Sequence, residues 1–447
     1  MTPRLHLLTT YSTTLLQWRM GGGDTVLMED PAQAHAVAAQ ALRLAARSQR
    51  PHVVLLGMGD GTLAATLLQS MPAGMTLIVC SLQPEEVRAA LVRSDLAAHL
   101  ATGHLHVAAD TSPWALLHLF LGASISPLQC TFCSNPTVDD TQLAQLRHWQ
   151  RLLHDATPVV LPDTHHCPCH TPAGTAGKAP LTVGAILHPE EPALADFFAH
   201  IPAWVHELVV VWDAHKPPAH HYPCAVPVRQ TARPLASDFS AQRNHMLDLA
   251  RSKAPASAHW LLYLDADERF AAATWQTLRA LVTHHDAPQQ STATQHAGTT
   301  PHAAAAPLPD APPAPHASVT PTPGAVVFPR HTFHPDANNV RMGYGLWPDL
   351  QVRLFRTTPD VHFQRPVHEV VMGITGATLL LPAHPILHHS HLLRDREALQ
   401  ARLGIFNLAA GNPVHRLSGG YPHLPANFFA QLESPLAHTG ILLANAP

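Results

Sequence analysis

The sequence predicts an α/β protein built from two domains and a connecting segment. Short apolar runs alternate with amphipathic stretches through both halves of the chain, an order typical of strands and helices packed in layers. The chain has 447 residues, which is more than one hydrophobic core usually organises. Residues 164–180 contain Pro, Gly, Thr and Ala but little to bury, which indicates a linker. We therefore expect one domain over 1–163, a second over 181–408 and a C-terminal tail over 409–447.

The composition argues against nucleic acid as a partner. The 27 Lys and Arg residues are outnumbered by 31 Asp and Glu residues, and the formal net charge is −4, so no broad basic face is available for phosphates. The 36 His and 43 Pro residues are scattered, which indicates a compositional bias. Apolar runs of about 18 residues and a secretory signal pattern are both missing from the sequence. We expect a cytoplasmic protein without a transmembrane segment, and peripheral association with a membrane stays open.

Short apolar runs in the first half predict the strands of an open sheet. The run His52–Leu56 leads through a glycine turn into a helical stretch, Leu63–Ser70, and then into a second run, Met75–Cys80. This strand, helix, strand order is typical of parallel sheets. Two further strands of the same sheet are predicted at Leu105–Ala109 and Pro158–Leu161, and one helix is predicted at Thr141–His154.

The second half repeats the α/β pattern and is interrupted once. A strand at Leu181–Leu187 precedes a helix near Pro192–His200 and a strand at Glu207–Trp212. Residues 284–323 are rich in Pro, Ala and Thr, so we expect a disordered insertion in a surface loop. The fold is predicted to resume at Ala325–Phe328 and to continue to a helical stretch near 394–408.

A cluster of acids follows another apolar run, Trp260–Leu264. Asp265, Asp267 and Glu268 come directly after it in the sequence LDADE. Ligands bind at the carboxyl ends of strands in open α/β sheets, and two carboxylates one residue apart can hold a divalent cation that bridges diphosphate oxygens. The alternative is an exposed turn in which Asp267 caps a helix. The motif alone favours neither interpretation.

Further blocks surround the acid motif in a recognisable order. An amphipathic stretch at 237–250 (SDFSAQRNHMLDLA) leads into the acidic strand, and a later block at 346–371 contains RLFR and a His-Glu pair. Together with the strand that ends at Asp213, these blocks resemble family 2 glycosyltransferases of GT-A fold. The likeness is to the bacterial branch that extends lipopolysaccharide cores or glycosylates proteins. It covers about 181–408 and implies a C-terminal GT-A domain.

The resemblance also implies an activity and a set of site residues. The activity is inverting, metal-dependent transfer of a sugar from a nucleotide-sugar donor to a hydroxyl group on a bacterial surface glycan or a protein. The general base would be Glu369, with Asp349 as the alternative. The donor would contact Glu190, Asp213, Arg243 and Asp265, and Mg²⁺ or Mn²⁺ would be held by Asp267 and His368.

Two arginines of the RLFR segment have an open assignment. Arg353 and Arg356 fit contacts with phosphate or acceptor, and their alternating pattern equally fits a strand with solvated arginines.

The chain departs from the family's pattern in two places. The family's Asn-Glu pair appears as Pro189-Glu190, and Ala214–Pro218 replaces the usual Ser-Thr-Asp run. These changes are compatible with a weakened donor pocket or with lost activity. A catalytically inactive pseudo-glycosyltransferase that serves as a scaffold is therefore one alternative function.

The first domain carries a second motif. Gly57, Gly59 and Gly61 follow an apolar strand and precede a helix, which resembles the glycine turn of Rossmann-like S-adenosylmethionine methyltransferases and spermidine synthases. Ser81 and Gln83 stand where those families usually have an acid. Asp110 is placed to contact an adenine-like group or to end a turn. A degenerate Rossmann-like module is favoured, and a methyltransferase is the enzymatic alternative.

Cysteine spacing allows a zinc site without requiring one. Two Cys pairs, 130/133 and 167/169, offer soft ligands together with neighbouring histidines. Their irregular spacing favours free thiols.

Overall fold

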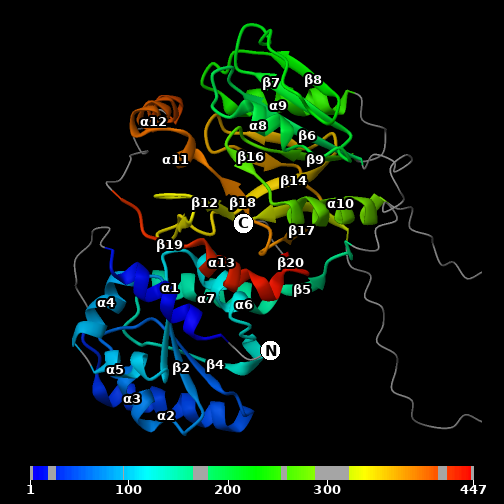
Figure 1. The fold of residues 1–447 in the computed structure, drawn as a ribbon. Coiled ribbons are helices and arrows are strands. Elements are labelled where there is room, and N and C mark those ends of the chain that lie inside the picture. Colours follow the sequence, from blue (N-terminus) through cyan, green and yellow to red (C-terminus); the bar gives the residue numbers. More distant parts are fainter. Residues whose placement is uncertain are drawn as a thin grey trace, which may run out of the picture.

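The computed structural model describes residues 4–18, 27–93, 95–164, 180–252, 259–286, 322–410 and 420–443. Most of the expected linker, 165–179, and most of the expected insertion, 287–321, lie outside the described residues. The described residues form two α/β units, one around a four-stranded sheet and one around a nine-stranded sheet (Figure 1). The mixed α/β class expected from the sequence is confirmed.

The first unit is a parallel, Rossmann-like sheet in the order β3-β2-β1-β4. All residues of β1 are buried, as expected for a parallel strand covered on both faces. The strands are β1 (His52–Leu56), β2 (Thr76–Ser81), β3 (Leu105–Ala109) and β4 (Cys130–Ser134). The helices are α1 (His6–Leu16), α2 (Pro31–Ser48), α3 (Thr62–Ser70), α4 (Pro84–Arg93), α5 (Leu96–Ala101), α6 (Pro113–Gly122) and α7 (Asp140–Asp155).

The two faces of this sheet belong to different hydrophobic clusters. Val53 and Leu55 pack with α2 and α3, whereas Val54 and Leu56 pack with α1, α6 and α7, because successive residues of a strand point to opposite faces. The cluster on the α1 side continues into the second unit through Trp347. The two units therefore share one continuous core on that side.

The second unit is a nine-stranded sheet in the order β5-β20-β17-β11-β14-β9-β6-β7-β8. The strands β9, β6, β7 and β8 are parallel, and β14 runs antiparallel to β9. Their bounds are β5 (Thr157–Val160), β6 (Leu181–Leu187), β7 (Glu207–Trp212), β8 (Val228–Ala232), β9 (His259–Tyr263), β11 (Pro323–Phe328), β14 (Gln351–Thr357), β17 (Ala377–Leu380) and β20 (Thr439–Leu443).

Helices and short strands surround this sheet. Asp238 caps α9 by accepting a hydrogen bond from the backbone N–H of Ala241 at 2.9 Å, a usual role for Asp at a helix start. The helices are α8 (Leu194–Ala199), α9 (Phe239–Arg251), α10 (Ala272–Asp286), α11 (Ser390–Leu393), α12 (Arg396–Ala410) and α13 (Ala426–Glu433). The short strands are β10 (Glu268–Arg269), β12 (Arg330–Thr332), β13 (Asn339–Arg341), β15 (His362–Gln364), β16 (Val370–Met372), β18 (Ile386–His388) and β19 (His423–Pro425).

One expectation about the chain's organisation is wrong. The strand predicted at Pro158–Leu161 does not join the first sheet. It forms β5, which pairs antiparallel with β20 at the edge of the nine-stranded sheet, where a proline is tolerated because one side of the strand needs no partner. The expected tail contributes β19, α13 and β20, and α13 lies between the two units (Figure 1). Its residues Phe428 and Phe429 are buried in the core that the units share.

Candidate functional site

The acid motif lies where β9 leaves the sheet. The turn closes on itself, because the backbone N–H of Asp265 donates to Glu268 Oε2 at 3.1 Å and that of Glu268 donates to the Asp265 carbonyl at 3.0 Å. Glu268 then begins β10, which pairs with β18. The three acids therefore lie at the carboxyl end of a parallel strand, the edge at which open α/β sheets bind ligands.

Asp265 lies between two arginines from different elements. Arg243, on α9, donates to its Oδ1 at 3.0 Å, and Arg353, on β14, donates to its Oδ2 at 2.9 Å. Burial alone would raise the pKa of Asp265, but the charges of Arg353 and Arg243 outweigh that effect and hold the pKa well below its ordinary value. Asp265 is therefore ionised at neutral pH.

Glu268 is the most deeply buried acid of the motif. Its side chain is 0% exposed, and its Oε1 accepts a hydrogen bond from Arg353 at 2.5 Å. Arg330, on β12, lies 3.5 Å from the same oxygen. Arg353 is only 3% exposed, so the alternative of a solvated arginine at this position is wrong. Arg356 packs over the Trp260 ring instead and donates to the His285 carbonyl at 3.1 Å.

Asp267 faces a different set of cations. Its Oδ2 accepts from Arg394 at 2.8 Å, and its Oδ1 lies 3.6 Å from His388 Nε2 at the end of β18. Arg402, on α12, lies 3.6 Å from Oδ2. Burial would raise the pKa of Asp267, whereas His388, Arg402 and Arg394 together lower it well below the ordinary value.

Glu191 completes this part of the site. It pairs with Arg394, and its Oε1 accepts from Arg402 at 3.4 Å. Glu190, the residue carried over from the family pattern, is exposed, and its backbone N–H contacts His188. The structure thus places Glu191, and not Glu190, beside the arginines that contact Asp267.

The two candidate bases lie at opposite ends of one chain of ion pairs. Glu369 accepts from Arg243 at 2.7 Å, and Asp349 accepts from Arg330 at 2.8 Å. Between these ends the order is Arg243, Asp265, Arg353, Glu268 and Arg330. We define the acid–arginine cluster as all residues of this chain of ion pairs, from Glu369 to Asp349, together with Glu191, Asp267, Arg394 and Arg402.

Two predicted site residues besides Glu190 lie outside the cluster. Asp213 follows β7 and accepts a hydrogen bond from the backbone N–H of Leu235 at 2.7 Å, which closes the loop after β8. His368 is exposed, with a positive φ of 54°, in the loop between β15 and β16. The imidazole that the structure places against Asp267 is His388.

Sequence reasoning missed His388, Arg330, Arg394, Arg402 and Glu191. These residues are far from the acid motif in sequence, and His388 is one of 36 histidines. The usable signal was Arg394 and Arg402, which lie at the start and in the middle of the predicted helical stretch near 394–408. Basic residues in or beside a helix that follows an apolar strand are candidates for contacting the edge of the sheet at which parallel strands end.

A divalent cation at Asp267 would have to be held partly by a substrate. Protein sites for Mg²⁺ with nucleotides use one or two carboxylates and complete the shell with phosphate oxygens and water. Asp267 Oδ1 and His388 Nε2 are near enough to share one ion. Within the described part of the chain, no three His, Cys, Asp or Glu side chains gather as a metal site of their own, so phosphates would have to supply further ligands.

The glycine turn of the first unit is filled by the protein's own acids. The backbone N–H of Gly59 donates to Glu86 Oε1 at 2.7 Å, and that of Leu63, in the first turn of α3, donates to Glu29 Oε2 at 2.7 Å. A Cβ at Gly59 would overlap Glu29 and Asn135. These donors are the ones that an anionic ligand would use at a helix N-terminus, and here they are already satisfied.

The cysteines that the structure describes are free thiols. Cys80, Cys130, Cys133 and Cys224 form no disulfide, and burial raises the pKa of Cys130 and of Cys133 to about 12. The other pair of the suggested zinc site, residues 167 and 169, lies outside the described residues.

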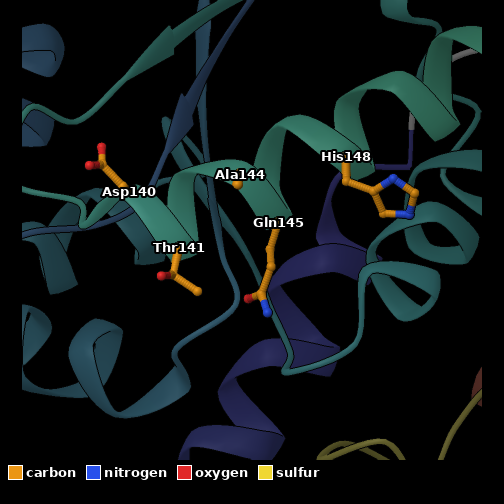
Figure 2. A pocket seen from close by; sticks show the side chains of 5 residues that line it. All are labelled: Asp140, Thr141, Ala144, Gln145 and His148. Carbon is orange, nitrogen blue, oxygen red and sulfur yellow. The ribbon is translucent and has the colours of Figure 1, made fainter.

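An open hollow on helix α7 is unrelated to the acid–arginine cluster. Figure 2 shows the residues that line it along the helix: Asp140, Thr141, Ala144, Gln145 and His148. The hollow belongs to the first unit, and it gathers neither paired acids nor arginines. We assign no site to it.

Comparisons with known proteins add little to this geometry. No family model matches the chain, and no curated protein matches it. Among solved structures, a putative O-methyltransferase from Klebsiella pneumoniae is 12% identical, with 36% of this chain and 82% of that chain covered and a TM-score of 0.18. A likeness at that TM-score carries no argument. Along the described segments, no helix combines the length and the apolar character needed to cross a membrane.

Proposed function

We propose that the chain is a glycosyltransferase that moves a sugar, with inversion, from a nucleotide-diphosphate donor to a hydroxyl group. The observation that carries the proposal is the position of Asp267. It lies at the carboxyl edge of a parallel strand, is nearly buried, and faces His388, Arg394 and Arg402. Carboxylate, imidazole and guanidinium groups converging on one point suit a bound diphosphate. The second unit would then be a GT-A domain.

The donor's phosphates would bind to arginines that the protein's own acids hold in place. Arg394 and Arg402 pair with Glu191 and Asp267, and guanidinium groups bind phosphate oxygens in the same planar way as carboxylates. A bound Mg²⁺ or Mn²⁺ would neutralise diphosphate charge as the sugar leaves. Asp267 and His388 would hold that ion, with His368 as the residue implied by the family resemblance. Asp265, Asp213 and Arg243 remain the proposed contacts of the donor, and Glu191 takes the place that the resemblance gives to Glu190.

The chemistry requires one carboxylate to accept a proton. In an inverting transfer the acceptor oxygen bonds to the anomeric carbon, the bond from that carbon to the diphosphate breaks, and the hydroxyl proton passes to the base. We propose Glu369 for this role and Asp349 as the alternative. Both are partly exposed, at 15% and 27%, so an acceptor can reach them. The acceptor class, a bacterial surface glycan or a protein, is proposed from the resemblance.

The test is donor turnover by the purified full chain. Release of nucleoside diphosphate from UDP-, GDP- and dTDP-sugars is measured with Mn²⁺, with Mg²⁺ and with a chelator. We expect release from at least one donor, and a loss of at least about 100-fold in Asp267→Ala. The matched control is Asp248→Ala, which removes a 74% exposed acid from α9 and should change nothing.

Two outcomes would contradict the proposal. If no donor is turned over with either metal and Asp267→Ala binds the donors as the unmodified chain does, the cluster is not a donor site and the scaffold alternative stands. If turnover survives complete chelation, the metal part fails while the transfer stands. If turnover instead requires the metal, comparing His388→Ala with His368→Ala by Mn²⁺ titration identifies the imidazole that contacts the ion.

A further inference from the structure

The loop that carries Asp349 is held by the first unit. This loop, 343–349, connects β13 to β14. Tyr344 and Asp349 both have positive φ, 49° and 44°, a conformation that costs non-glycine residues free energy and persists where the surroundings enforce it. The enforcing contacts come from elements more than 200 residues away in the sequence.

A buried hydrogen-bond relay reaches the loop from α1 and β3. The backbone N–H of Gly343 donates to the Tyr11 hydroxyl at 3.0 Å, and that hydroxyl donates to Asp110 Oδ2 at 2.5 Å. The backbone of Gly345 also interacts with Asp110 and lowers the pKa of its carboxyl group. Tyr11 and Asp110 are both 0% exposed. Buried hydrogen bonds of this kind are costly to leave half made, so they fix the loop's backbone.

Packing supports the same loop from the same side. Gly343 has a φ of 68°, and a Cβ there would overlap Leu15 of α1. The Trp347 ring is buried against Tyr11 and Phe429, with ring centroids 5.5 Å and 5.3 Å away. The Tyr344 hydroxyl also contacts the first unit, where it lies 3.2 Å from Glu85.

The other end of the loop belongs to the acid–arginine cluster. Asp349 accepts from Arg330, and Arg330 lies 3.5 Å from Glu268. Gln351 donates to the second oxygen of Asp349 at 2.9 Å. The position of Asp349 is thus determined by Arg330 and Gln351 on one side and by the backbone of its own loop on the other.

We propose that Tyr11 and Asp110 are positioning residues for the site, and that the first unit serves to hold Asp349 against Arg330. Asp110 ends β3 at the carboxyl edge of the Rossmann-like sheet, where such sheets usually contact ligands. Here that edge contacts a loop of the second unit. The kinetic consequence of this inference rests on the proposed function with Asp349 as the base, whereas its structural consequence does not.

The experiment compares Tyr11→Phe with Ser12→Ala. Tyr11→Phe keeps the ring packed against Trp347 and removes only the hydroxyl of the relay. Ser12→Ala removes a neighbouring buried hydroxyl of α1, which donates to the Val107 carbonyl and accepts from the Ala109 N–H, both within the first unit. Both variants lose buried hydrogen bonds, so a general loss of stability would affect them alike.

Amide hydrogen exchange of the peptide 342–350 is the first readout. We expect exchange to speed up at least about 10-fold in Tyr11→Phe and to stay unchanged in Ser12→Ala. The second readout is steady-state transfer: kcat should fall about 10-fold in Tyr11→Phe with donor KM changed less than about twofold. Tyr344→Phe, which removes a contact from the loop side, should shift both readouts in the same direction.

Unchanged exchange in Tyr11→Phe, or equal acceleration in Ser12→Ala, would overturn the inference. If the unmodified chain turns over no nucleotide sugar, the proposed function fails, and the exchange measurement still decides whether the relay holds the loop. If exchange changes as expected while kcat does not, the relay holds the loop but the loop does not position a group needed for transfer.

Discussion

Glu268→Gln should destabilise the second unit far more than its conservative chemistry suggests. The two carboxylate oxygens accept from different donors, Oε1 from Arg353 and Oε2 from the backbone N–H of Asp265. An amide has one acceptor oxygen, so in either orientation its NH₂ group faces a donor. The substitution also removes a charge partner from Arg353, which is 3% exposed. Breaking a buried pair from one side costs about 3–5 kcal/mol, and we expect a loss in this range.

Asp196→Asn is the matched control. Asp196 pairs with Arg269 at 2.8 Å, but its side chain is 73% exposed, so water replaces the lost contact and the expected change is below about 1 kcal/mol. Urea unfolding of both variants, followed by far-UV circular dichroism at neutral pH, gives the two free energies. Equal effects would refute the reasoning, because they would mean that burial of Glu268 does not set the strength of its contacts.

Three further predictions concern the donor, pH and the glycine turn. Glu191→Gln should raise donor KM at least about 10-fold by loosening Arg394, whereas its exposed neighbour Glu190→Gln should change it less than about twofold; the reverse order would restore the family assignment. Burial raises the pKa of Asp110 from 3.8 to about 7, so its stabilising contribution is complete below the lower value and is lost as pH rises through the higher one. Asp110→Asn should therefore flatten the fall in unfolding free energy from about pH 4 to 8, a difference of roughly 4 kcal/mol at most. Calorimetric titration with S-adenosylmethionine should show no binding, because Glu29 satisfies the helix N-terminus beside the turn; a micromolar dissociation constant would contradict this.

Local patterns predicted the elements of the fold well. The strands at His52–Leu56, Leu105–Ala109, Leu181–Leu187 and Glu207–Trp212 have the expected bounds, because short buried runs between turn residues have few alternatives. The helix at 141–154 is α7, extended by one residue at each end. The same reasoning failed for β5, whose partner β20 is some 280 residues away along the chain.

The candidate site likewise contains residues that local sequence patterns identified and residues that those patterns missed. The LDADE acids and Arg243 were found in the sequence because the acids directly follow one strand and Arg243 lies in the helix that precedes it. The cations around Asp267 come from β18, α11 and α12, more than 120 residues later. Sequence periodicity contains no information about which side chain of a remote element meets an acid, so Glu190 was chosen over Glu191 from the pattern alone.

By itself the sequence determined the α/β class, the two-part organisation and the strand that delivers the acids, since these follow from local periodicity and turn chemistry. Only the tertiary structure decided which cations surround Asp267, how the glycine turn is filled and where Asp110 contacts the chain. Those features depend on long-range packing of buried charged and polar groups, each of which must find a partner. The partner is selected by the three-dimensional arrangement of elements, which no local pattern specifies.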